Sequence, residues 1–271
     1  MINDMKNLLL SEAIGDIAGM PYEFDPEKGY ERVNLLLEKN DYTDDTVCTF
    51  ACAEALLRGT SVGEALRARC VADPLRGYGG RYVWWIMTPV LTPPYDSFGN
   101  GSAMRVSSAG FMARTEEECV ELATQTAMPT HNHPEGVKGA VSTALAIFHA
   151  FHGKDKDYIR HNVLERYYPE WAGKTYKEIK PTYGFDETCQ RTVPAALICF
   201  LESKDYVDCL KLAIALGGDA DTLAAISGPM AYAMYRYMPQ ELIDNALRKL
   251  PQWMVELSDE FDQYVEENIG R

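Results

Sequence analysis

The stretch from residue 137 to residue 151, VKGAVSTALAIFHAF, indicates the fold class of this chain. Its apolar residues Val141, Ala144, Leu145 and Phe148 follow the i, i+3, i+4, i+7 spacing, which puts them on one face of an α-helix. A helix with such a face buries it against other elements. The pattern therefore predicts a helix that packs on a core.

The same spacing recurs along most of the chain. Ile243, Ala246, Leu247 and Leu250 repeat it, and similar patterns predict helices over residues 5–18, 45–58, 118–127, 192–202, 206–216, 222–237 and 251–267. Pro194 and Pro251 are expected in first helical turns, where proline is tolerated. The one patch with strand-like composition, Tyr82 to Met87, is short. We therefore expect an all-α fold.

Three segments interrupt the helical pattern, namely residues 19–44, 73–102 and 167–186. Long loops that are rich in Gly, Tyr and Trp are more often functional than disordered, so we expect them to be ordered. No internal repeat, low-complexity tract or flexible linker divides the chain. The prediction is a single compact helical domain over residues 1–271.

The composition limits the classes of function. With 271 residues, of which 46% are hydrophobic, the chain can build one large core. A formal net charge of −14 opposes binding of double-stranded nucleic acid, which needs a basic surface. The same charge repels a free anionic nucleotide. Such a ligand would need compensation from metal ions, backbone N–H groups or a few arginines.

The sequence shows no recognisable targeting or membrane-spanning segment, and its cysteine usage is typical of a reducing compartment. We therefore expect a cytoplasmic protein that does not enter a membrane. The uncharged apolar runs are shorter than the ~20 residues that cross a bilayer, and the N-terminus lacks the basic region and cleavage site of a secretory signal. The seven cysteines form no C-x-x-C pair and sit mostly in apolar helical stretches. We expect reduced core thiols and no disulfides.

Two acidic segments each open a predicted helix. The first is Thr43-Asp44-Asp45-Thr46, and the second is Gly217-Gly218-Asp219-Ala220-Asp221-Thr222. Each segment alone is explained by helix capping, because Thr and Asp accept hydrogen bonds from the free N–H groups of a first turn. Together they offer four carboxylates and two threonine hydroxyls, which are the hard oxygen ligands that Mg²⁺ or Mn²⁺ prefers. A two-metal site is the alternative to capping.

Two glycine-rich segments are candidates for binding phosphate. They are Arg76-Gly77-Tyr78-Gly79-Gly80-Arg81-Tyr82 and Phe98-Gly99-Asn100-Gly101-Ser102-Ala103-Met104-Arg105. Such loops let backbone N–H groups approach phosphate closely, and nearby aromatic rings can stack on a base. Ordinary turns are the other interpretation of each loop.

Two further features could carry chemistry. The segment Thr130-His131-Asn132-His133-Pro134-Glu135 could cap a helix or present His131 to a ligand, and its spacing to Cys48 and Cys52 matches no zinc pattern. Glu23, between Tyr22 and Phe24, could have a raised pKa and act as an acid or base, although surface glutamates are common. Gly15 and Gly19 would let a helix approach its neighbour closely.

These clusters, in this order, resemble the ADP-ribosylglycohydrolase family, which includes the dinitrogenase reductase-activating glycohydrolases. The matching elements are Gly15-Asp16 to Glu23-Phe24, Thr43 to Thr46, Gly99-Asn100-Gly101 to Met104-Arg105, Thr130-His131 to Pro134-Glu135, and Gly217 to Thr222. The resemblance implies an all-α fold with two Mg²⁺ or Mn²⁺ ions in a cleft. Thr43, Asp44 and Asp45 would bind the ions from one side, and Asp219, Asp221 and Thr222 from the other.

The resemblance also implies how ADP-ribose would lie. The distal ribose hydroxyls would contact the metal ions, and the diphosphate would contact the loops formed by Gly77, Tyr78, Gly79 and Gly80 and by Gly99, Asn100, Gly101 and Ser102. Met104 and His131 are further expected contacts, and Tyr78, Tyr82 or Tyr183 is expected to stack on adenine. Glu23 would serve catalysis or substrate gating, and Asp44 or Asp45 would activate water together with the ions.

The expected function is metal-dependent hydrolysis of the glycosidic bond between ADP-ribose and an acceptor, with arginine of a protein as the leading acceptor. Serine-linked, nucleobase-linked or small-metabolite ADP-ribose are alternatives within the enzyme class. A non-catalytic binder of ADP-ribose and a metal phosphoesterase that cleaves the diphosphate are alternatives of other classes. Ala220 stands where the family often has threonine, and the chain is short for the family, so loops that recognise the acceptor are expected to be trimmed.

Overall fold

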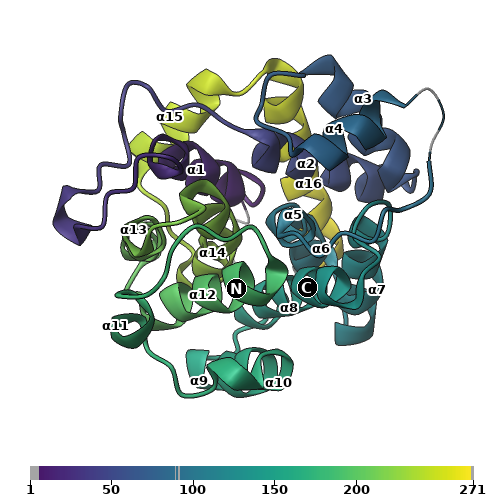
Figure 1. The fold of residues 1–271 in the computed structure, drawn as a ribbon. Coiled ribbons are helices and arrows are strands. Elements are labelled where there is room, and N and C mark those ends of the chain that lie inside the picture. Colours follow the sequence, from purple (N-terminus) through teal and green to yellow (C-terminus); the bar gives the residue numbers. More distant parts are fainter. Residues whose placement is uncertain (1–5, 89, 91, 270–271) are drawn as a thin grey trace.

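Two helices from distant parts of the chain meet at the centre of the fold (Figure 1). In the computed structural model, which describes residues 6–88, 90 and 92–269, they are α1 (Leu10–Gly19) and α14 (Ala220–Tyr235). A Cβ atom added at Gly15 would lie 2.3 Å from the carbonyl oxygen of Ala224, and one at Gly228 would lie 2.6 Å from the carbonyl oxygen of Ser11. The two backbones therefore touch, as the small residues of the first helix predict.

The other helices surround this pair. They are α2 (Asp44–Arg58), α3 (Val62–Ala72), α4 (Gly80–Met87), α5 (Gly101–Met104), α6 (Ser107–Met112), α7 (Glu116–Ala127), α8 (Pro134–Phe151), α9 (Lys156–Ile159), α10 (Glu165–Tyr167), α11 (Tyr176–Ile179), α12 (Cys189–Glu202), α13 (Tyr206–Leu216), α15 (Gln240–Lys249) and α16 (Gln252–Asn268). Short 3₁₀ turns cover Met20–Tyr22, Tyr30–Arg32 and Pro169–Trp171, and a π-helical turn covers Arg160–Leu164. In Figure 1, α3 and α4 lie to the right of α1 and α14, and α11 and α13 lie to the left.

The described residues contain no strand, and one isolated bridge joins Gly99 to Thr188. Buried apolar side chains from most helices form one contiguous core, which includes the Val141, Ala144, Leu145 and Phe148 face of α8. These observations confirm the all-α, compact helical fold. All seven cysteines are buried and free, in agreement with reduced core thiols. Among the described helices, none combines the length and apolarity that a membrane span requires.

Most of the predicted helices form, and the differences have physical causes. The strand-like patch Tyr82 to Met87 is helical, because Tyr82, Trp85 and Ile86 are buried at helical spacing despite their β-favouring composition. Helix α12 begins at Cys189, so Pro194 lies in its interior and not in its first turn. Pro251 immediately precedes α16, close to its expected place. The start of the helix expected from residue 5 lies outside the described residues, and the observed helix begins at Leu10.

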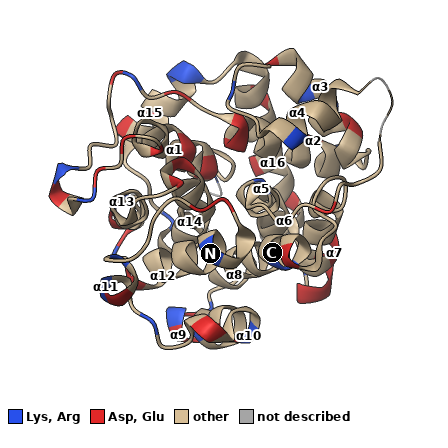
Figure 2. Ribbon diagram, in the orientation of Figure 1, with Lys and Arg blue, Asp and Glu red and all other residues tan. Residues whose placement is uncertain are grey.

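Helix starts bring the acidic segments to the centre of the molecule. Thr43 caps α2, and Asp219 is the cap residue of α14. Gly217 and Gly218 precede α14 with φ of 80° and 102°, a conformation that other residues rarely adopt. Figure 2 shows acidic residues on many elements, while Lys and Arg are fewer and scattered in this view.

Candidate active site

A cavity of about 450 Å³ opens where the ends of α1, α2, α4, α5 and α14 converge. All six predicted metal-binding residues line it, together with Glu23 and both glycine-rich segments. Its lining residues are Glu23, Phe24, Thr43, Asp44, Asp45, Cys48, Arg76, Gly77, Gly79, Gly80, Arg81, Tyr82, Tyr95, Ser97, Gly99, Asn100, Gly101, Met104, Arg105, His131, Glu187, Asp219, Asp221 and Thr222. Segments that are up to about 200 positions apart in the sequence thus form one site.

The first acidic segment is held by a fully buried carboxylate, Asp16 of α1. Asp16 accepts hydrogen bonds from the backbone N–H and the Oγ1 of Thr43, both at 2.8 Å. It also accepts from the N–H and the Oγ1 of Thr46, at 3.2 and 2.5 Å. These four bonds fix the first turn of α2 and aim Asp44 and Asp45 at the cavity. The sequence motif contained Asp16, but sequence reasoning gave it no role.

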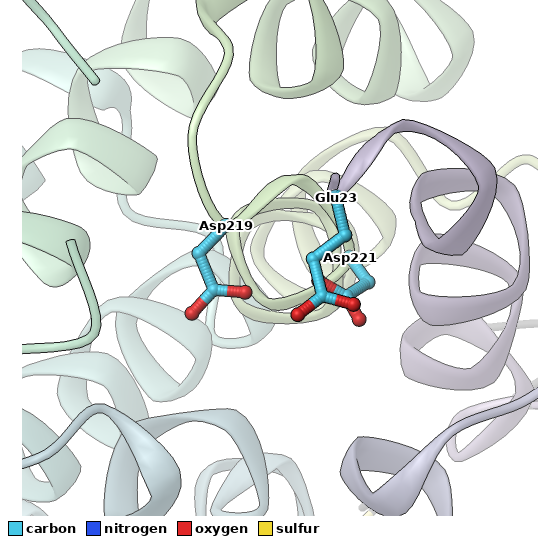
Figure 3. Close-up of side chains that lie close together, drawn as sticks. All are labelled: Glu23, Asp219 and Asp221. Atoms are coloured by element: carbon cyan, nitrogen blue, oxygen red, sulfur yellow. The ribbon is translucent and has the colours of Figure 1, made fainter. Parts of the chain in front are cut away.

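The second acidic segment lies beside Glu23, as Figure 3 shows. One ligand oxygen from each of Glu23, Asp219 and Asp221 can lie within 4.8 Å of the others. The contact between helices enforces this arrangement, because a Cβ atom at Gly19 would lie 2.5 Å from both the carbonyl oxygen of Ala220 and the Cα of Asp221. Glu23 therefore belongs to a group of three carboxylates and does not stand alone on a surface loop.

The carboxylates of the two segments face each other. Burial raises the pKa of Asp45, and the Asp221 carboxylate adds the largest contribution from a neighbouring charge. Burial likewise raises the pKa of Asp221 and raises that of Glu23 to about 7, with Asp219 and Glu187 adding to the shift at Glu23. So many buried acids in one cavity need either protons or cations to neutralise them.

The donor set fits divalent metal ions. Every predicted ligand supplies oxygen, and Oδ2 of Asp45 is buried with no hydrogen-bond partner in the described part of the chain. Asn100 donates from Nδ2 to Oδ2 of Asp219 at 2.6 Å, which orients that carboxylate. An orphaned buried carboxylate oxygen beside other acids is the arrangement that a cation would satisfy.

The glycine-rich segments line the same cavity. A Cβ atom at Gly101 would lie 3.2 Å from the His131 ring, so the loop lies directly on this imidazole. Burial, with the Arg105 charge, holds the pKa of His131 below its usual range, and the His131 Nδ1 lies 2.7 Å from Oγ1 of Thr130. A neutral His131 thus supports the loop and borders the cavity.

Three of the predicted substrate contacts do not line the cavity. Ser102 is fully buried and donates to the carbonyl oxygen of Gly136, and Tyr78 donates to the carbonyl oxygen of Asp73 behind Tyr82. Tyr183 is buried against Gly218. Of the three tyrosines proposed to stack on adenine, Tyr82 alone lines the cavity, and its ring is 8% exposed and already stacks on Tyr78 and Trp85.

Three lining residues lie outside the motifs quoted from the sequence, namely Tyr95, Ser97 and Glu187. Glu187 reaches the site because its carbonyl oxygen accepts a 2.7 Å hydrogen bond from the N–H of Asn100. That contact joins two loops that are almost ninety residues apart, and no local pattern predicts it. Only its position beside Asp186 in a loop expected to be functional could have drawn attention to it.

Comparison with known proteins agrees with this geometry. The chain is 27% identical to the human ADP-ribosylhydrolase ARH3, over 76% of this chain and 73% of that protein. It is 27% identical to the ADP-ribosylarginine hydrolase Tri1 of Pseudomonas putida strain GB-1, over 95% and 79%. A solved structure described as an ADP-ribosylglycohydrolase-related protein complex has the same fold, with a TM-score of 0.73, 23% identity and 96% coverage of both chains. The model of the ADP-ribosylglycohydrolase family matches residues 2–269, and this chain belongs to that family of hydrolases.

Proposed function

We propose that this protein hydrolyses the N-glycosidic bond between ADP-ribose and an arginine side chain of a protein, with the help of two Mg²⁺ or Mn²⁺ ions. The observation that carries the proposal is the convergence of carboxylates from the turn after α1 and from the starts of α2 and α14 in one cavity with two glycine-rich loops. Similarity to Tri1, whose name describes it as an ADP-ribosylarginine hydrolase, supports arginine as the acceptor.

The metal ions would be held by oxygen atoms from the two helix starts. Thr43, Asp44 and Asp45 would bind from α2, and Asp219, Asp221 and Thr222 from α14. Bound cations of this kind polarise the oxygens of a substrate and lower the pKa of water. In this interpretation Asp16 is a positioning residue, because it reaches the ions only through Thr43 and Thr46.

The remaining residues of the cavity would bind and orient ADP-ribose. The loops at Gly77–Gly80 and Gly99–Gly101 would receive the diphosphate, and Tyr82 would border the adenine. The distal ribose would then lie near Glu23, Asp45 and Asp221, with its anomeric carbon among carboxylates. Positive charge develops at that carbon as the glycosidic bond breaks, and the negative charges nearby would stabilise it.

The test is release of free ADP-ribose from an arginine-ADP-ribosylated protein, with Mg²⁺, with Mn²⁺ and with a chelator. We expect release that either ion supports and the chelator abolishes. A serine-linked substrate run in parallel tests the acceptor, and cleavage of that linkage alone would overturn the assignment to arginine. Formation of AMP and ribose phosphate would show that the protein cleaves the diphosphate and not the glycosidic bond. Binding of ADP-ribose without any cleavage would show a binding protein.

A further inference from the structure

Two phenylalanines stack on each other at the edge of the cavity although both are largely in solvent. Phe24 follows Glu23 after α1 and lines the cavity, and Phe185 precedes α12 and lines the adjoining surface hollow. Their ring centroids are 5.9 Å apart with an interplanar angle of 28°, and their side chains are 81% and 50% exposed. Large apolar side chains gathered at the rim of a polar cavity are typical of a binding surface.

An acidic side chain without a cation partner lies beside these rings. Glu187 is exposed, lines the cavity, and has no Lys, Arg or His nitrogen within ion-pair distance among the described residues. Its neighbour Asp186 differs, because it lies 3.4 Å from Nε of Arg191. The Glu187 charge also reaches Glu23, since it contributes to the raised pKa of that residue. Exposed aromatic rings and an unpaired carboxylate therefore line the cavity of the proposed catalytic acids and the hollow that adjoins it.

We infer that Phe24, Phe185 and Glu187 form the subsite that receives the guanidinium group of the acceptor. This inference rests on the proposed function and goes further by assigning the residues that select arginine. A guanidinium is planar and cationic, so it can stack on an aromatic face and pair with a carboxylate at the same time. The hydroxyl of a serine acceptor can do neither.

The position of the subsite agrees with the direction in which the acceptor would leave. Phe24 is bonded to Glu23, whose carboxylate groups with Asp219 and Asp221. The proposed adenine contact, Tyr82, lies on α4, in a different part of the cavity lining. Adenine can donate its N6 amine to a carboxylate but carries no positive charge, whereas a guanidinium is a cation whose charge an unpaired carboxylate would balance. The exposed rings and Glu187 thus suit the acceptor better than the base.

The first experiment measures binding of agmatine, a guanidinium compound without the backbone of arginine, by calorimetry in the presence of ADP-ribose and Mg²⁺. We expect the wild-type protein to bind agmatine and to reject N-(4-aminobutyl)urea, in which a neutral urea replaces the guanidinium. Phe24→Ala should weaken agmatine binding about two- to fivefold, as for a cation–π contact at an exposed site. Glu187→Gln should weaken it by about the same factor, as for an exposed ion pair. Glu31→Gln and Trp84→Ala are matched controls, because both residues are exposed and neither lines the cavity.

The second experiment separates this inference from the proposed function. With arginine-linked and serine-linked substrates, Glu187→Gln should raise KM for the arginine linkage alone and leave kcat almost unchanged. Failure of the wild-type protein to bind agmatine, or an equal effect of the substitutions on both linkages, would overturn the subsite. If agmatine binds as expected but no ADP-ribosyl substrate is cleaved, the subsite stands and the proposed function falls.

Discussion

The floor and the rim of the cavity are built in opposite ways. The floor, which we define as Thr43, Asp45, Asp219 and Asp221, is buried. Its residues Asp219 and Asp221 lie at the start of α14, which touches α1 through glycines. The rim, defined as Phe24, Arg81, Phe185 and Glu187, is exposed, and all but Arg81 of these residues lie in loops. Because the floor is buried at helix contacts, its charges are held in fixed positions. Because most of the rim lies in exposed loops, its residues can be substituted without disturbing the core. We therefore expect the floor to carry the reaction and the rim to select the acceptor.

The largest effect is expected from a carboxylate of the floor. Asp221→Asn keeps the size of the side chain but removes a negative charge that both Asp45 and Glu23 face. We expect ADP-ribose release to fall on the order of 100- to 1,000-fold, the range seen when one preorganised electrostatic contact is lost. Turnover at saturating Mg²⁺ measures it, and Asp244→Asn on the exposed face of α15 is the control. Full turnover by the Asp221 variant would contradict the proposal that the carboxylates of the floor are needed for ADP-ribose release.

A smaller effect is expected from Asp16, which supports the floor from behind. Asp16→Ala removes four hydrogen bonds to Thr43 and Thr46, and we expect metal affinity and turnover to fall about 10- to 100-fold, as for other residues that orient ligands. Asp16→Asn should be milder. Its oxygen can replace Oδ2 as the acceptor of three bonds, while its NH₂ can donate to the Thr43 hydroxyl. Calorimetry with Mn²⁺ checks this order, and equal losses in both variants would contradict a positioning role.

The floor was largely predictable from the sequence, and the rim was not. Thr43 to Asp45 and Asp219 to Thr222 could be found because acidic helix starts and the order of the motifs are local features. Glu187 and Tyr95 could not be found, because they reach the cavity through contacts between loops such as that of Asn100 with the Glu187 carbonyl. Helix α4 was not predicted, because residues 73–102 interrupt the helical pattern and the composition of Tyr82 to Met87 favours strands, although the burial of Trp85 decides in favour of a helix. The roles of the individual site residues stay predictions until variants are measured.

The helix contact beneath the floor gives a third prediction, on stability. In Gly19→Ala the new methyl group would collide with the backbone of Ala220 and Asp221, so α1 and α14 must move apart. We expect a loss of about 1–3 kcal/mol in the free energy of unfolding, as for other overpacked contacts, with weaker binding of Mn²⁺. Urea unfolding and calorimetry measure the two effects. Gly184→Ala is the matched control, because a methyl group there meets no atom within 4 Å and the backbone has no positive φ.

The smallest effect is expected at Asp262, a buried acid outside the cavity, which can be compared with the buried acids of the floor. Asp262 of α16 is a buried acid that faces no cluster of carboxylates, and it accepts hydrogen bonds from the N–H groups of Asn7 and Leu8 at 2.5 and 3.0 Å. Burial raises its pKa to about 7 in the folded protein, whereas an unfolded aspartate titrates near pH 4. Between these values the folded state holds a proton that the unfolded state has released. This group therefore makes stability fall as pH rises from about 4 to about 7.

Asp262→Asn removes this proton and should flatten the pH dependence of unfolding without lowering ADP-ribose release. The variant loses one acceptor for the Asn7 and Leu8 N–H groups, so it should be less stable than the wild type at pH 5. Its deficit should then shrink towards pH 7, with a slope of at most about 1.4 kcal/mol per pH unit for one proton. Urea unfolding at several pH values measures this slope. A constant deficit would mean that Asp262 is ionised in the fold, and that burial without neighbouring carboxylates does not suffice to keep an acid protonated in this protein.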